Sequence, residues 1–338
     1  MVKCGRGNMP ARFRFRRAGA LGYGLRVLAP ATLRFTILLA LASLGACAPQ
    51  ARRDSVGRYV RGKETIPLTT VVFSGNRYVA QADLGLGKPI PLMIHGNARM
   101  FLMLTHEIGE QLTGGPVPKV EDYGYSAKGK GLIRVPLLRL GTRRITDLRD
   151  VPVFDYVPNG ASPVQGMVGV PFLTSQRAAI DFSRDVLILG VGASRAPNKG
   201  LERLGYLPVP MSTDANGRVI IQAFFPALGR SLPITPSTVS SALTLHRPPF
   251  AGRLPMTRDT TESDQSPSGT RPALYSSDRV AFEIAGVRLA SPASFEDFAE
   301  YANVPESMLG SLGLLGYDWM KEHEAIIDYG NHFLYFQP

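Results

Sequence analysis

Two aspartates stand at matching positions of the chain and are the first candidates for acid–base chemistry. Asp181 and Asp328 lie 147 residues apart, and each occupies the same place in an Ala-x-Ile-Asp-aromatic sequence. Two carboxylates held close together share one proton. One of them can then activate a water molecule while the other polarises a carbonyl group. This chemistry requires a fold that brings both side chains into one cleft.

Histidines are the second candidates, but their spacing indicates no metal site. The chain has five of them: His95, His106, His246, His323 and His332. No pair shows the His-Glu-x-x-His spacing of a zinc centre, and there is no phosphate-binding loop or dinucleotide fingerprint. We therefore expect neither a metal nor a cofactor.

The two aspartates belong to a longer internal repeat. Residues 166–189 and 313–336 align without a gap at a constant offset of 147. Both copies contain Gly-x-x-Gly, a large apolar pair and a final apolar strand. A repeat of this length indicates that one structural unit is used twice.

Strand patterns dominate the rest of the chain. Short apolar or alternating runs are separated by turn sequences, among them Gly330-Asn331, and the chain has 35 glycines and 27 prolines. Such a pattern is typical of a mostly β protein. Short helices are expected at 105–112 and 295–303.

The domain prediction follows from the repeat and from two breaks in the pattern. We predict an N-terminal domain at 67–190, a linker at 191–205 and a C-terminal domain at 206–338. Residues 251–272 are rich in Thr, Ser, Asp and Pro, which indicates a long flexible loop within the second domain.

The positive charge of the chain lies mainly in its leader. Of the formal net charge of +11, residues 1–46 supply +8 and contain no acid, which leaves +3 (11 − 8) for the rest. The body therefore lacks the charge excess that favours nucleic-acid binding, and no nucleic-acid partner is expected.

The leader has the layout of an export signal. A basic stretch precedes the apolar run 35–46, and this run is shorter than the ~20 residues that span a bilayer. It ends in Leu44-Gly-Ala-Cys47, which resembles a bacterial lipobox. We predict a lipoprotein signal peptide at 1–46, starting at Met1 or Met9, lipidation of Cys47 and a tether at 47–66. The alternative is an ordinary signal peptide with a coincidental cysteine.

Localisation follows from the same resemblance. Position 48 is alanine rather than aspartate. By similarity to Gram-negative sorting, a lipid-anchored protein of the cell envelope is implied, at the outer membrane and facing the periplasm. The inner membrane stays open as an alternative. Cys47 would be the single cysteine of the processed chain, so no internal disulfide is expected.

The repeated segment resembles the C-terminal half of a lobe in retropepsin-like aspartic peptidases. A lobe of that family runs through hydrophobic-hydrophobic-Asp-Thr/Ser-Gly, a flap, hydrophobic-hydrophobic-Gly, a short helix, Ile-Asp and a last strand. This order fits twice between about residues 66 and 338. The resemblance implies two β-barrel lobes in a pseudo-twofold arrangement with a cleft between them. It also places Asp181 and Asp328 away from that cleft, in structural hydrogen bonds.

Both catalytic motifs of the family are degenerate in this chain. His95 stands at the first motif position and Thr235 at the second. Histidine can act as a base near neutral pH, but threonine cannot share a proton. We therefore expect no catalytic residues. The predicted cleft residues are Gly96, Asn97, Tyr125, Pro236 and Ser237.

These observations favour an inactive aspartic peptidase homologue that binds a peptide or protein in the cell envelope. A cleft between two lobes can hold an extended peptide through main-chain hydrogen bonds without any chemistry. One alternative is an active aspartyl-type endopeptidase or hydrolase with a non-standard site. A second alternative is a structural subunit of an envelope assembly whose cleft is filled.

Overall fold

The computed structural model describes most of the chain after residue 58. The described residues are 59–60, 62–72, 76–117, 131–153, 163–192, 194–215, 217–259, 265–266, 269–270, 273–302 and 304–338. They belong to one compact unit, Arg52–Pro338. The predicted signal peptide, Cys47 and Tyr125 lie outside the described residues. We call residues 59–190 the first half and residues 206–338 the second half.

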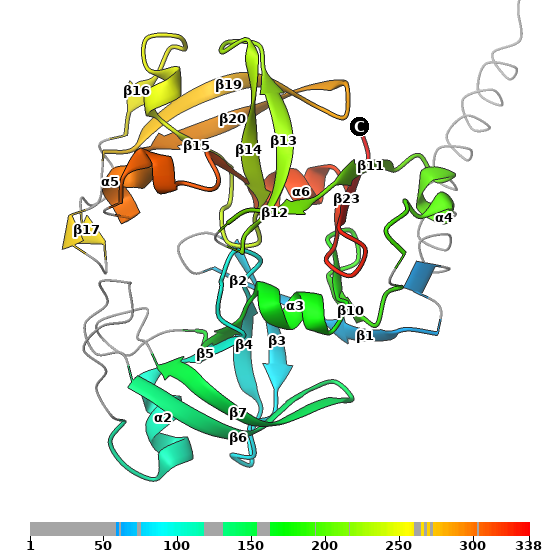
Figure 1. Ribbon diagram of the computed structural model, residues 1–338, viewed down its shortest axis with the longest axis vertical. Helices are drawn as coiled ribbons and strands as arrows, with labels where there is room; N and C mark the ends of the chain where they lie inside the picture. Colours follow the sequence, from blue (N-terminus) through cyan, green and yellow to red (C-terminus); the bar gives the residue numbers. More distant parts are fainter. Residues whose placement is uncertain are drawn as a thin grey trace, which may run out of the picture. The chain divides into compact units, whose positions relative to one another are not determined.

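A seven-stranded sheet forms the first half (Figure 1). Its strands, in spatial order, are β2 (Thr69–Val72), β3 (Asn76–Ala82), β4 (Ile90–Ile94), β8 (Gly166–Val168), β5 (Leu102–Leu104), β7 (Arg143–Val153) and β6 (Gly131–Leu140). The sheet curls towards closure, because Asp83 beyond β3 exchanges two backbone hydrogen bonds of 2.8 Å with Arg139 of β6. This half is therefore barrel-like.

An eight-stranded sheet forms the second half. Its strands are β12 (Ser212–Thr213), β13 (Val219–Phe225), β14 (Arg230–Pro236), β21 (Gly313–Leu315), β15 (Leu243–His246), β20 (Val287–Glu296), β19 (Tyr275–Ile284) and β16 (Thr257–Arg258). It also closes on itself, because β13 pairs with β19 at Phe224 and Glu283. A separate two-stranded piece consists of β17 (Gln265–Ser266) and β18 (Gly269–Thr270).

The two sheets have matching strand directions. β4 and β14 each run parallel to their neighbours β8 and β21, while β5 and β15 run antiparallel to the same neighbours. β8 and β21 differ by the offset of 147, as do α3 (Val170–Ser175) and α6 (Tyr317–Glu322). The sequence repeat is thus a structural repeat, and the prediction of a mostly β protein is confirmed.

A six-stranded sheet joins strands from both halves. Its order is β1 (Glu64–Pro67), β10 (Val186–Leu189), β9 (Ala179–Asp181), β22 (Ile326–Asp328), β23 (Phe333–Phe336) and β11 (Leu207–Pro210). In the antiparallel pair β9–β22, Ile180 lies opposite Ile327, its own counterpart in the repeat. The register therefore relates these two strands by a local twofold axis.

The remaining helices are short. They are α2 (His106–Thr113), α4 (Lys199–Glu202), α5 (Phe298–Ala302) and the 3-10 turns η1 (Pro248–Phe250) and η2 (Glu306–Met308). α2 and α5 occupy the two predicted helical segments. Within the part of the chain described here, no helix is long and apolar enough to pass through a bilayer.

The predicted linker 191–205 is packed rather than open. Val191 and Leu201 are fully buried, and they join an apolar cluster with Ile188, Ile326 and Tyr335 on one face of the six-stranded sheet. Asn198 caps α4, because its side-chain oxygen accepts the N–H groups of residues 200 and 201. The segment differs from an open linker because its apolar side chains cover a sheet face that would otherwise be exposed.

Candidate functional site

A single threonine joins the turns that follow β4 and β14, because its hydroxyl accepts one hydrogen bond and donates another. The backbone N–H of Gly96 donates to Thr238 Oγ1 at 2.8 Å, and the Thr238 hydroxyl donates to the Ile94 carbonyl at 2.7 Å. Both bonds are buried. The two turns thus hold a fixed position relative to each other, and residues 142 positions apart in sequence meet there.

Backbone register identifies Ser237, and not Thr235, as the counterpart of His95. His95 N–H donates to Val168 O, and Ser237 N–H donates to Leu315 O, which is the repeat counterpart of Val168. Thr235 instead lies opposite Leu314, so it corresponds to Met93. The pairing of His95 with Thr235 expected from the sequence is therefore corrected by two residues.

The correction has a physical origin in the offset between the halves. It is 147 in the repeated segment but 142 (237 − 95) at the motif, and a strand pattern with period two does not reveal a change in loop length. The dipeptide Ser237-Thr238 was the available signal, because the resemblance stated above expects threonine or serine directly after the motif position. Thr235 is fully buried, and its hydroxyl makes no hydrogen bond within the described residues.

His95 is a neutral, partly buried imidazole. Burial, followed by the positive charge of Arg77, lowers the pKa of His95 to about 4. Nδ1 accepts a hydrogen bond from the Asn97 N–H at 3.3 Å, so the proton of the neutral ring is on Nε2. A ring with this pKa is a weak base at neutral pH, and the lone pair on Nδ1 already accepts the hydrogen bond from Asn97.

Ser237 is fully buried and acts as a hydrogen-bond acceptor. Its Oγ accepts the N–H groups of Val239 at 3.2 Å and Ser240 at 3.1 Å, and Asn97 Nδ2 lies at 3.4 Å. The hydroxyl oxygen thus stands where backbone donors would stabilise a carboxylate, but it carries no charge. No hydrogen bond joins Ser237 to His95 among the residues described, so the pair lacks the contact that activates a serine nucleophile.

The hydroxyl of Tyr329 fills the space under the first turn. A Cβ atom added to Gly96 would lie 2.4 Å from Tyr329 Oη. Tyr329 is buried, and its hydroxyl makes no hydrogen bond within the described part of the chain. Its repeat counterpart is Phe182, which has no hydroxyl. The two halves therefore differ at this contact.

Asp181 and Asp328 are the last residues of β9 and β22 in the six-stranded sheet, and their side chains bond to the turns that follow. Asp181 accepts from the backbone and the hydroxyl of Ser183, whereas Asp328 accepts from the Tyr59 hydroxyl at 2.7 Å and from Asn331. Burial raises the pKa of both carboxyl groups. These hydrogen bonds agree with the structural role expected for the two residues.

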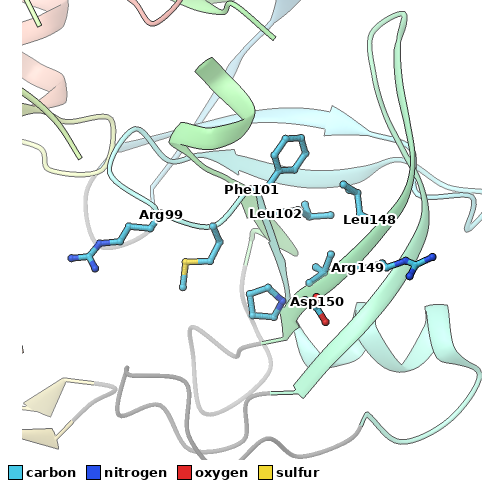
Figure 2. Close-up of a pocket in the computed structure, with 9 residues that line it drawn as sticks. Arg99, Phe101, Leu102, Leu148, Arg149 and Asp150 are labelled. Carbon is cyan, nitrogen blue, oxygen red and sulfur yellow. The ribbon is translucent and has the colours of Figure 1, made fainter. Parts of the chain in front are cut away.

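A pocket of about 310 Å³ lies on the first half, directly after the His95 turn (Figure 2). It is lined by Arg99, Met100, Phe101, Leu102, Leu148, Arg149, Asp150, Val151 and Pro152. In Figure 2 the side chains of Leu102 and Leu148 lie next to each other, while those of Arg99 and Arg149 extend outwards in opposite directions. Sequence reasoning missed this pocket, because it depends on two segments that meet only in the folded sheet.

Of the predicted cleft residues, the structure places Gly96, Asn97, Pro236 and Ser237 in or next to the two joined turns. In the described ranges, no three His, Cys, Asp or Glu side chains are grouped so that they could hold a metal ion. No model of a known protein family matches the chain, and no curated protein matches it either.

Proposed function

We propose that the chain is a two-lobed, pepsin-like β protein that has lost its catalytic pair and binds a peptide or protein. The two halves would be the lobes, and the turns at His95 and Ser237 would mark the former catalytic centre between them. Lipidation of Cys47 would anchor the protein in a bacterial cell envelope, where its partner would be an envelope peptide or protein.

The observation that carries this proposal is the pair of turns joined by Thr238. They keep a hydrogen-bonded frame, yet they present a neutral imidazole and a hydroxyl instead of two carboxylates. Aspartic peptidase chemistry needs two carboxyl groups that share one proton, and neither the imidazole nor the hydroxyl is a carboxyl group. Binding makes no such demand, because an extended peptide is held by main-chain hydrogen bonds and side-chain pockets.

The two alternatives predict different behaviour. An active hydrolase would require His95 to act as a base despite its low pKa and its engaged Nδ1. A structural subunit of an envelope assembly would neither cleave nor retain peptides.

A peptide-library digest with the lipid-free chain from residue 48, followed by mass spectrometry between pH 3 and 8, separates these cases. His95→Ala and Ser237→Ala are the test variants, and His332→Asn in the β22–β23 turn is the matched histidine control. We expect no cleavage with any of them and a recoverable set of bound peptides. Cleavage that is lost in His95→Ala but kept in His332→Asn would show a hydrolase and contradict the proposal.

A further inference from the structure

The pocket in Figure 2 combines an apolar interior with cationic ends. Its apolar lining comes from Met100, Phe101, Leu102, Leu148, Val151 and Pro152. Its charged lining consists of two arginines and one acid, Asp150. The volume of about 310 Å³ is at the lower end of the range of ~300–1,000 Å³ for ligand sites, which suits one or two side chains.

Arg99 is the arginine of this pocket that is available to a ligand. It is exposed and makes no ion pair or hydrogen bond with any described residue. Arg149 instead forms an ion pair with Asp147 at 3.2 Å, and Asp147 also forms an ion pair with Arg134. An unpaired guanidinium at the rim of an apolar pocket favours a ligand that carries a carboxylate next to an apolar group.

The lining of the pocket carries a net positive charge, because its two arginines outnumber its one acid, Asp150. A pocket with this balance of charge favours an acidic ligand over a basic one.

The pocket and the joined turns share one apolar cluster. Met100 packs against an apolar cluster that contains Ala98, Met93 and Met103, and Val239 from the second turn packs against the same cluster. Methionine side chains adapt to ligands of different shapes. The lining residue Met100 thus packs next to the residues that carry the two turns.

We propose that the pocket takes an apolar side chain from an acidic peptide segment and that Arg99 pairs with a carboxylate of that segment. The inference rests on the proposed function and names the chemistry of its ligand. An extended peptide directs successive side chains to opposite faces, so an acid adjacent to the apolar residue projects away from the pocket floor towards its rim.

Three labelled octapeptides test the proposal: alternating Leu-Asp, alternating Leu-Asn and alternating Ser-Asp. Their affinities for the processed, lipidated protein in detergent are measured by fluorescence polarisation at 50 mM and 500 mM salt. We expect Leu-Asp to bind about 3- to 5-fold more tightly than Leu-Asn at low salt, and less so at high salt. Ser-Asp should bind at least about 5-fold more weakly than Leu-Asp, because the pocket then receives no apolar group.

Protein variants assign each preference to its residue. Arg99→Ala should abolish the difference between Leu-Asp and Leu-Asn and leave that between Leu-Asp and Ser-Asp. Leu148→Trp, which fills the pocket, should abolish the preference for leucine. Arg144→Ala is the matched control, because Arg144 is an exposed arginine of β7, the strand that supplies Leu148 and Arg149, and it does not line the pocket.

The outcomes separate this inference from the function on which it rests. Equal affinities for Leu-Asp and Leu-Asn, or the same result for Arg99→Ala and Arg144→Ala, overturn the acidic ligand while peptide binding still stands. If no octapeptide binds and the library experiment recovers no bound peptide, the proposed function is contradicted as well. If the protein forms a dimer that dissociates in Arg99→Ala, a second copy of the chain occupies the pocket. That result would overturn the assignment to a separate peptide.

Discussion

Gly96 and Thr238 are counterparts in the two halves, yet Thr238 supplies both of the buried hydrogen bonds that the structure describes between the turns. Its hydroxyl accepts from the Gly96 N–H and donates to the Ile94 carbonyl, and Gly96 has no side chain with which to return these bonds. A side chain at position 96 would collide with the Tyr329 hydroxyl, which lies beneath the first turn. The frame of the candidate site is therefore asymmetric.

Removal of the Thr238 hydroxyl should destabilise the protein. Thr238→Val keeps the shape of the side chain but leaves a buried N–H and a buried carbonyl without partners. We expect the free energy of unfolding to fall by about 2–3 kcal/mol in urea titrations. Thr238→Ser keeps both hydrogen bonds and serves as the control. Equal losses for the two variants would mean that the methyl group, and not the hydroxyl, provides the stability.

The contact between Gly96 and Tyr329 can be tested by a double-mutant cycle. Gly96→Ala introduces a Cβ atom 2.4 Å from Tyr329 Oη, so it should cost about 1–3 kcal/mol of unfolding free energy. Tyr329→Phe removes the hydroxyl and should make the same alanine far less costly. A cycle that gives purely additive losses, measured by urea denaturation, would contradict the contact.

His95 should make the protein less stable in mild acid. Its pKa is about 4 in the folded chain and ~6.5 when unfolded, so the unfolded state binds the proton first. The stability gained from the neutral ring is full above pH ~6.5 and is lost progressively as the pH falls towards 4, by at most about 3 kcal/mol.

The comparison of wild type with His95→Gln isolates this effect, because glutamine does not titrate. Asp181 and Asp328 act in the opposite sense: their pKa values are raised in the folded state, so their contribution becomes more favourable as the pH falls. When the pH falls from 7.5 to 4.5, the urea midpoint of wild type should therefore fall relative to that of His95→Gln. Equal movements would contradict a low pKa for His95.

The hydrogen bond between Tyr59 and Asp328 should hold the segment around Tyr59 on the six-stranded sheet. Tyr59→Phe removes the donor from a buried carboxyl group, and we expect a loss of about 1–3 kcal/mol together with faster proteolysis near residue 59. Lys63→Met is the control, since Lys63 contacts the Tyr59 carbonyl and ring and leaves the hydrogen bond from the Tyr59 hydroxyl in place. Equal proteolysis of both variants would assign the docking to other contacts.

The predicted lipid anchor depends on one side chain. Cys47→Ser should abolish labelling by radioactive palmitate and release the protein from the membrane fraction. Labelling that persists would contradict lipidation at Cys47. Release without any loss of labelling would point to a different anchor.

The sequence alone determined the mostly β character, the helix near residues 105–112 and the repeat that pairs Asp181 with Asp328. These features follow from local periodicity and from a gap-free offset, both of which depend on neighbours along the chain. The structural role of the two aspartates could also be expected, and their turn hydrogen bonds agree with it.

Only the tertiary structure decided which residues share the candidate site. Ser237 and not Thr235 matches His95, Tyr329 reaches under Gly96, and 191–205 packs on a sheet face. The pocket between 99–102 and 148–152 likewise depends on β5 and β7 lying side by side. Each relation depends on hydrogen bonds and packing between distant segments, and strand alternation cannot specify these when loop lengths differ between the halves.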